Sequence, residues 1–266
     1  MDKLFISADI EGVCGIVDWV ETEIGEQQGA YFRSEMTKEV GAACDAAVEK
    51  GVKEIFIKDA HGSGRSIDPS ALPQEIRIMR AWTRDPFSMM AGLDKSFGGV
   101  FFIGYHSAAG TDGSPLAHTM NGNNVAVKIN GNLASEFLIN SYTAGYMGVP
   151  VLLLTGDAAL CSSAGLVNPN IKTVAVSEGI GNASVSIHPA LAHARIKEAA
   201  EKALSADPKS FAVNMPSMFK LSIHFKQHYL AKRGSYYPGA KQTGAHEVSY
   251  KSKNWDEVLA FLFFVL

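Results

Sequence analysis

The segment LFISADIEG at residues 4–12 decides the fold class of this chain of 266 residues. Its apolar run predicts a short buried strand, which ends at the polar residues Asp9 and Glu11. The same arrangement, an apolar run that ends in polar residues, returns in EIFIKDAHG at 54–62 and in VFFIGYH at 100–106. Short runs of this kind, with helical stretches between them, are typical of β-α-β units on a largely parallel sheet.

The stretches between these runs complete the pattern. An Ala- and Glu-rich segment predicts a helix that Gly51 stops, and Asn130-Gly131 after an apolar run predicts half of a hairpin. The sheet is therefore expected to be mixed. The predicted strands are residues 4–8, 54–58, 100–104, 151–155 and 173–176, with a hairpin strand at 125–129, and the predicted helices are residues 31–50, 134–147 and 189–204.

The character of the chain changes near Asp207, where a helix that begins with Pro189 has ended. We predict an α/β domain at residues 1–207, with a mixed, largely parallel sheet flanked by helices, and a smaller C-terminal α+β subdomain at 208–266. The final run VLAFLFFVL is much shorter than the ~20 residues needed to span a bilayer. We expect it to pack as a helix or strand at a subunit interface.

The composition excludes several classes of protein. With 47% hydrophobic and 19% charged residues the chain is typical of soluble globular proteins. Its 24 Lys and Arg against 27 Asp and Glu argue against a nucleic-acid partner. Asp2 argues against a signal peptide. The three cysteines, Cys14, Cys44 and Cys161, are an odd number without C-x-x-C spacing, which favours a reducing cytoplasm over a disulfide framework.

Residues of metal-binding type follow three of the predicted strands. Asp9 and Glu11 follow the first, His61 follows the second and His106 follows the third. Ligands of open α/β sheets sit beyond the carboxyl ends of the strands, so these side chains are expected to converge. Two carboxylates one residue apart on extended backbone point the same way and repel unless a cation lies between them. The neighbouring imidazoles favour a transition metal, and zinc suits mixed ligands of this kind.

Each of these residues also has an ordinary structural interpretation. A strand-end Asp or Glu taken alone is more often a helix cap or a loop residue. Glu136, in the first turn of a predicted helix, favours the helix dipole without binding any ligand. Only the coincidence at one end of several strands favours a metal site, and the pattern alone leaves both interpretations open.

Several motifs, in this order and spacing, resemble the D-aminopeptidase (DppA-type) family: SADIEGVCGI, KDAHGSG, FFIGYHSAAG, AHTMNG, NLASEFLIN and PVLLLTGD. The resemblance implies two Zn²⁺ ions per chain and a catalytic histidine at His118. It also implies a self-compartmentalising ring, a decamer around a chamber that admits only short peptides. The metal ligands that it implies are Asp9, Glu11, His61, His106 and Glu136.

We therefore predict a cytoplasmic dizinc aminopeptidase that removes the N-terminal residue of short peptides, in particular of dipeptides containing D-amino acids. Three carboxylates against two Zn²⁺ ions leave one positive charge, which favours a metal-bound hydroxide as the nucleophile. Asp9 is the expected bridging ligand, and His118 is assigned as general acid/base.

Two other functions compete with this one. The first is a two-metal amidohydrolase or phosphatase, but only Arg65 and Lys58 lie close to the predicted ligands, and phosphate chemistry favours nearby cations. The second is a non-catalytic zinc-binding scaffold. A structural zinc site is closed by four ligands, whereas five ligands for two ions and the additional His118 favour catalysis.

The remaining candidates carry weaker signals. Asp59 is expected either to orient His61 or to cap a loop. Ser177 and Asn182 stand where the family is expected to have a lysine and often an arginine, which bears on substrate contacts and stereospecificity. The candidates for substrate contact are Tyr105, Asn121 and Arg33, and the histidines interpreted as structural or surface residues are His188, His193, His224, His228 and His246.

Overall fold

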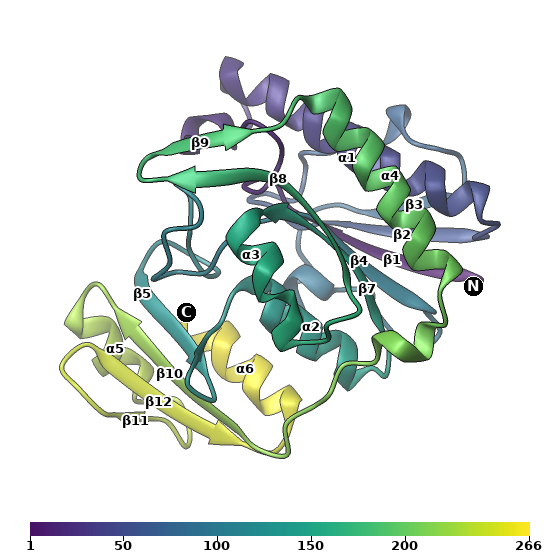
Figure 1. Cartoon of the computed structure of the whole chain (residues 1–266). Helices are drawn as coiled ribbons and strands as arrows, with labels where there is room; N and C mark the ends of the chain where they lie inside the picture. The colour runs from purple at the N-terminus through teal and green to yellow at the C-terminus, as the bar shows by residue number, and fades with distance from the viewer.

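Seven strands form the larger sheet of the computed structural model, which describes residues 1–266. The strand order is β3-β2-β1-β4-β7-β8-β9, and every neighbouring pair is parallel except β8 with β9 (Figure 1). The predicted mixed, largely parallel α/β sheet is thus confirmed. The strands are β1 (Lys3–Ala8), β2 (Glu54–Asp59), β3 (Ile76–Met79), β4 (Gly99–Tyr105), β7 (Val151–Asp157), β8 (Lys172–Ile180) and β9 (Ala183–Ser186).

Helices cover both faces of this sheet. The helices α1 (Gln27–Glu49) and α4 (Pro189–Ser205) lie side by side on one face, and α2 (Glu136–Tyr146) covers the other (Figure 1). Every residue of β4 and β7 is consequently buried, which explains why these strands are continuous apolar runs rather than alternating ones. The other helices of the larger unit are α3 (Ala158–Ser163) and the short 3-10 helices η1 (Trp19–Glu21), η2 (Pro69–Ala71), η3 (Ser88–Met90), η4 (Ala164–Leu166) and η5 (Pro208–Phe211).

All five strands predicted for the sheet are present, and the predicted helices are present with ends shifted by a few residues. The strands β3 and β9 were not predicted. Both are edge strands of four residues, and each is only partly buried, so neither forms a long apolar run.

A second, antiparallel sheet has the order β11-β12-β10-β5-β6. The strand β5 (Asn124–Ile129) turns into β6 (Asn132–Leu133) through Asn130 and Gly131, whose positive φ angles of 52° and 88° suit a tight hairpin turn. The later strands are β10 (Phe219–Phe225), β11 (Lys241–Gln242) and β12 (Glu247–Ser252). This sheet therefore combines strands from both sides of Asp207, and the domain boundary at that residue stays a prediction.

The helices α5 (His228–Gly234) and α6 (Trp255–Val265) accompany the second sheet. The apolar C-terminal run lies in the helix α6. Of the two predicted alternatives, a helix or a strand, the helix is present. Trp255 and Phe261 are buried in it, but Phe264 is 68% exposed. None of the helices combines the length and the apolar character needed to cross a membrane.

Candidate metal centre

The carboxyl ends of three central strands and the start of one helix meet at a single cluster. Asp9 and Glu11 follow β1, His61 follows β2 and His106 follows β4 directly, while Glu136 is the first residue of α2. All five predicted ligands are brought together. They form two overlapping groups whose possible ligand atoms lie within 4.8 Å of one another, one made of Asp9, Glu11 and His61 and one made of Asp9, His106 and Glu136.

Asp9 lies between the two groups. Its Oδ1 is 3.4 Å from Nδ1 of His61, and its Oδ2 is 3.6 Å from Nε2 of His106. Glu11 Oε2 lies 2.9 Å from the same His61 nitrogen, and Glu136 Oε2 lies 3.6 Å from the same His106 nitrogen. Each imidazole thus faces one oxygen of Asp9 and one oxygen of a glutamate that the other imidazole does not share.

Glycines permit this close approach of the strand ends. A Cβ on Gly12 would lie 1.8 Å from the carbonyl oxygen of Tyr105. A Cβ on Gly104 would lie 2.3 Å from the carbonyl oxygen of Asp9, and Gly104 has a φ of +71°, which disfavours other residues. Any side chain at these two positions would push apart the backbone segments that carry Asp9 and His106.

Two atoms of the cluster are buried without a hydrogen-bond partner, namely Oδ2 of Asp9 and Nε2 of His106. A buried polar group without a partner costs about 1–3 kcal/mol, so such atoms are rare in folded proteins. A cation between them would satisfy both. Three carboxylates and two imidazoles also form a donor set that zinc accepts. The residues present therefore fit two metal ions.

The electrostatics of the cluster also favour a cation. Burial and the neighbouring Glu11 raise the pKa of Asp9 well above its usual value. Burial alone would lower the pKa values of His61 and His106, but the surrounding carboxylates raise them to about 11 and about 10. The carboxylates thus hold protons on both imidazoles, and a metal ion can take over the compensating role of those protons.

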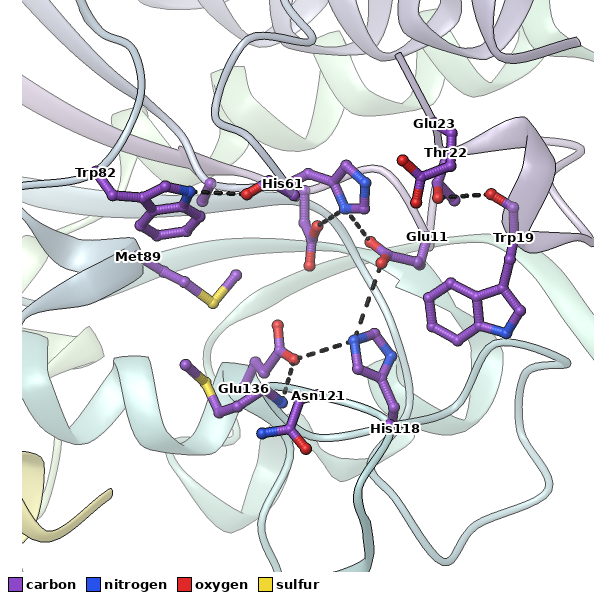
Figure 2. Close-up of a pocket in the computed structure, with 15 residues that line it drawn as sticks. Glu11, Trp19, Thr22, Glu23, His61, Trp82, Met89, His118, Asn121 and Glu136 are labelled. Carbon is purple, nitrogen blue, oxygen red and sulfur yellow. Dashed lines mark hydrogen bonds and ion pairs between the residues drawn. The ribbon is translucent and has the colours of Figure 1, made fainter. Parts of the chain in front are cut away.

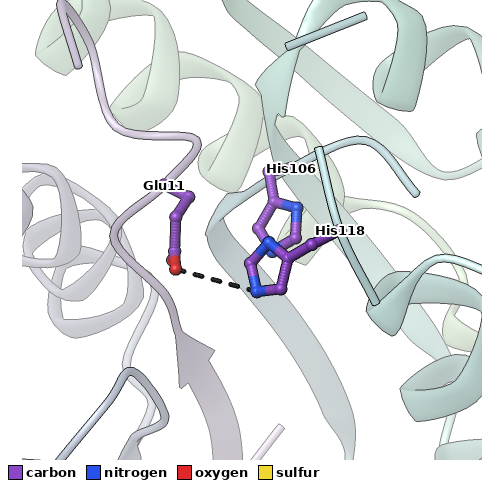
Figure 3. Close-up of side chains that lie close together, drawn as sticks. All are labelled: Glu11, His106 and His118. Carbon is purple, nitrogen blue, oxygen red and sulfur yellow. Dashed lines mark ion pairs between the residues drawn. The ribbon is translucent and has the colours of Figure 1, made fainter. Parts of the chain in front are cut away.

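His118 lies against the cluster from the loop before β5. Its ring stacks on the ring of His106, with centroids 4.2 Å apart, and its Nε2 is 3.9 Å from Oε1 of Glu11 (Figure 3). The same Nε2 is 3.6 Å from Oε1 of Glu136. Nδ1 bonds to the carbonyl oxygen of Leu116 at 2.8 Å and so carries the proton, which leaves the lone pair of Nε2 facing the carboxylates. Burial and the neighbouring His106 lower the pKa of His118.

His118, Glu11 and His106 form a third group with metal-binding geometry. The position of His118 therefore serves a ligand and a proton carrier equally well. The two roles can be distinguished by the metal content of the protein, because removal of a ligand lowers it and removal of a proton carrier does not.

A buried aspartate that we did not predict supports His106. Asp157, at the end of β7, accepts hydrogen bonds from the backbone N–H of Ser107 at 2.6 Å and from its hydroxyl at 2.5 Å. The carbonyl oxygen of Ser107 accepts from Nδ1 of His106 at 2.9 Å, which directs Nε2 toward the cluster. The sequence signal was an aspartate directly after the fourth apolar run, PVLLLTGD, which we interpreted only as part of a motif.

A second buried carboxyl group supports the loop that carries Asp9 and Glu11. Glu39 in α1 accepts the N–H of Cys14 at 2.8 Å through Oε1, while its Oε2 has no partner. Burial raises the pKa of Glu39 to about 8. Since an unfolded glutamate titrates near ~4.3, the folded chain binds this proton more tightly, and the associated stability is lost as the pH rises from there through about 8.

Replacing Glu39 by glutamine is expected to change this pH dependence. The amide still offers an acceptor to Cys14 but cannot ionise, so the variant should match the parent protein at about pH 4 and exceed its free energy of unfolding by a few kcal/mol at about pH 9. Urea unfolding at the two pH values measures the difference. An equal difference at both values would show that the folded chain does not hold the proton on Glu39.

A cavity of about 290 Å³ opens directly above the cluster (Figure 2). This is at the small end of the ~300–1,000 Å³ found for ligand pockets. Its lining includes Asp9, Glu11 and Glu136 but no lysine or arginine. Other lining residues, most of them not predicted, are Trp19, Thr22, Trp82, Met89, Met120 and Asn121.

Of the three candidates for substrate contact, only Asn121 lines this cavity. Tyr105 is completely buried, where its hydroxyl bonds to Ser7 and Asn140, and Arg33 donates to the carbonyl oxygen of Glu23. The expectation for Tyr105 was therefore wrong, whereas a substrate contact of Arg33 stays a prediction. Tyr105 directly precedes His106, but successive residues of a strand point to opposite faces of the sheet.

Asp59 caps a loop, because its Oδ2 accepts the N–H of Ile67 at 2.8 Å. Ser177 lies in β8 and Asn182 in the turn that follows, and neither lines the cavity. The five remaining histidines lie outside it: His188 caps α4, His193 pairs with Glu35, and His224, His228 and His246 group on the second sheet.

The fold and the cluster together define an α/β protein with a candidate centre for two metal ions at the carboxyl end of a largely parallel sheet. The chain belongs to the D-aminopeptidase family, whose family model matches residues 2–264. It is 31% identical over 254 residues to a D-aminopeptidase of Bacillus subtilis (strain 168). The matched residues cover 95% of this chain and 92% of the relative.

A solved structure with the same fold is the Zn-dependent D-aminopeptidase DppA from Bacillus subtilis, a self-compartmentalizing protease. The TM-score is 0.91 at 29% identity, and the match covers 99% of this chain and 96% of that chain. The resemblance inferred from the motifs is confirmed.

Proposed function

We propose that this chain is a dizinc aminopeptidase that releases the N-terminal residue, in particular a D-residue, from short peptides. The observation that carries the proposal is the cluster of three carboxylates and two imidazoles at the floor of a small cavity. The zinc dependence of the related Bacillus enzyme supports it. Asp9, Glu11 and His61 would hold one ion, and Asp9, His106 and Glu136 would hold the other.

The metal ions and the residues around them have separate roles in the proposed reaction. Bound zinc supplies a polarised carbonyl and an acidified water. His118 directs the lone pair of Nε2 into the site and can take a proton from the attacking water and return it to the leaving amine. Glu136 accepts the N–H of Met120 at 2.7 Å and so fixes the loop of His118 relative to α2. Trp19 packs against this histidine in a T-shaped arrangement, with ring centroids 5.0 Å apart.

The alternatives find less support in the site. A phosphatase requires cations near the metals, but no lysine or arginine lines the cavity. Lys58 is completely buried, where its Nζ donates to the carbonyl oxygens of Asp59 and Ala81. A non-catalytic zinc site is closed by its ligands and requires neither an open cavity above the cluster nor a neutral imidazole such as that of His118.

A panel of matched D- and L-dipeptides with a common second residue tests the proposed function. We expect cleavage at the N-terminal residue, faster for the D-peptide of each pair, and no cleavage of N-acetylated peptides. Release of phosphate from phosphate esters in place of peptide cleavage would favour the phosphatase. Preference for the L-peptides would leave an aminopeptidase and refute the assigned stereochemistry.

Two zinc ions per chain are expected, because five ligands including three carboxylates exceed what one tetrahedral ion requires. Metal analysis of extensively dialysed protein that has never met a chelator measures the ratio. Incubation with a chelator should abolish peptide cleavage, and added zinc should restore it. A metal content near zero in fully active protein would refute the proposed centre.

We further propose that the chain assembles into a ring-like homo-oligomer, a decamer by family resemblance. The related Bacillus enzyme is a self-compartmentalizing protease, which supports an assembly of this kind. So do the exposed aromatic side chains at the C-terminal end of α6, where Phe263 and Phe264 are 39% and 68% exposed and have ring centroids 5.1 Å apart. The three cysteines are free and buried, in keeping with a cytoplasmic location.

Light scattering is expected to give a mass several times the 28.5 kDa of one chain. Replacing Phe264 by lysine should lower this mass, because a charge at an aromatic contact must be desolvated. Lys251→Ala, an exposed change on the second sheet, serves as the control and should leave the mass unchanged. A monomer of the parent protein at micromolar concentration would refute the assembly but not the chemistry.

A further inference from the structure

We propose that Trp82 determines the specificity for the N-terminal residue of the peptide. With Met89 and Met120, which line the same cavity, it forms a non-polar wall that receives the side chain of the residue to be released. Trp82 and Met120 also line a neighbouring hollow together, which places Met120 on the side of Trp82. The inference rests on the proposed function, because it uses His118 to identify the side of the site on which the amine leaves.

The cavity has two unlike sides (Figure 2). Trp82 and Met89 lie on one side and His118 and Trp19 lie on the other, with Glu11, His61 and Glu136 between them. A group that protonates the leaving amine must lie near it, so the second residue of a bound peptide occupies the side of His118. The side chain of the first residue then extends toward Trp82.

Trp82 is held in place from two directions. Its Nε1 donates to the carbonyl oxygen of Gly62 at 2.7 Å, in the loop that carries His61. The ammonium of Lys58 lies 4.1 Å from the centroid of the indole ring. Lys58 is completely buried, and the same ammonium donates to the carbonyl oxygens of Asp59 and Ala81. A cation buried against the ring fixes the position of the indole much more firmly than an exposed contact would.

Backbone strain is concentrated at the same wall. Five residues other than glycine have positive φ angles, and one of them belongs to the hairpin turn between β5 and β6. The other four are Met120 itself, with a φ of 65°, and three residues of the loop around Trp82, namely Ala81, Arg84 and Ser88, with φ angles of 63°, 64° and 48°. Unfavourable backbone conformations of this kind persist mainly where a functional site depends on them.

The chemistry of the wall selects the class of side chain. The one polar hydrogen of Trp82 is already bonded to Gly62, and Met89 and Met120 offer only thioethers. A polar side chain placed there would lose its hydrogen bonds to water without replacement, whereas a non-polar one would gain from burial. The preferred substrates are therefore peptides with a non-polar N-terminal residue.

Two peptide series test the proposal, one with varied first residues before a constant glycine and one with varied second residues after a constant D-alanine. For Trp82→Ala, the ratio of kcat/KM between D-Leu-Gly and Gly-Gly should fall about tenfold or more, the usual effect of lost contact in a non-polar pocket. The ratio between D-Ala-Leu and D-Ala-Gly should stay unchanged. Trp82→Phe, which keeps an aromatic wall, should retain most of the first ratio even if the alanine variant does not fold.

Trp19→Ala is the matched control, because Trp19 lines the opposite side of the cavity. It should change selectivity for the second residue and leave selectivity for the first unchanged. An equal loss on every peptide for Trp82→Ala, or a change confined to the second residue, would overturn the inference alone. Failure of the parent protein to cleave any peptide would refute the proposed function and this inference together.

Discussion

Replacing Asp9 by alanine is expected to remove both zinc ions and to lower kcat/KM for dipeptides by at least about 10³-fold, since the metal ions supply several kcal/mol of transition-state stabilisation. The reason is the position of Asp9 between the two groups of candidate ligands. Its two oxygens face His61 and His106 respectively, so no other carboxylate can replace it for both ions. Without a bridging charge the two dications also repel each other.

Glu11→Ala is the matched comparison, because Glu11 is a similarly buried carboxylate of the same cluster. Asp9 belongs to both groups of predicted ligands, whereas Glu11 belongs only to the group that contains His61. We expect it to retain more zinc than Asp9→Ala. Metal analysis and peptide cleavage of both variants, prepared in parallel, measure the difference. Normal turnover with two bound ions in the Asp9 variant would exclude Asp9 as a bridging ligand.

The stability of the two proteins after chelation separates a metal effect from a folding effect. Burial and the neighbouring Glu11 raise the pKa of Asp9, so the fold disfavours the ionised form of Asp9. Its removal should therefore not lower the free energy of unfolding of the chelated protein. A much less stable chelated variant would mean that Asp9 supports the fold itself.

The strands that carry the cluster could be predicted because their signals are local. The strands β1, β2 and β4 are apolar runs buried in the centre of the sheet, and each is followed at once by residues of metal-binding type. Parallel strands end at the same edge, so the convergence of these residues on one edge could be predicted without the strand order. Glu136 is different, because its first-turn position on α2 has an ordinary explanation and only the family resemblance implied a role for it.

The second sheet could not be assigned from local patterns. Its central pairing joins β5 to β10, with Ile129 opposite Leu221, across a long stretch of chain. Neither strand by itself indicates its partner, so the hairpin at Asn130-Gly131 was predicted but not the sheet to which it belongs.

The walls of the cavity were missed for a related reason. Trp19 belongs to a short 3-10 helix and Trp82 to an irregular loop, and neither lies in a segment with a helical or strand period. Their convergence on the cluster depends on contacts such as the bond from Trp82 to Gly62, which only the folded chain contains. Residues on irregular loops of this kind often carry function, but sequence periodicity does not place them.

Replacing His118 by alanine is expected to leave both zinc ions bound and to slow amide hydrolysis by about 10²-fold or more, the usual contribution of a positioned acid/base. The reason is that the two candidate metal groups around Asp9 are complete without His118. Its Nδ1 is engaged with the carbonyl oxygen of Leu116, and its lowered pKa keeps Nε2 free to accept a proton at neutral pH.

Amide cleavage needs this proton carrier, because the leaving amine must be protonated as the tetrahedral intermediate collapses. An amino-acid ester with a good leaving group needs it less. The His118 variant should therefore lose more activity on a dipeptide than on such an ester, and zinc analysis of the same samples provides the control. If both substrates slow equally and zinc is lost, the third group of Glu11, His106 and His118 is a true metal site and His118 is a ligand.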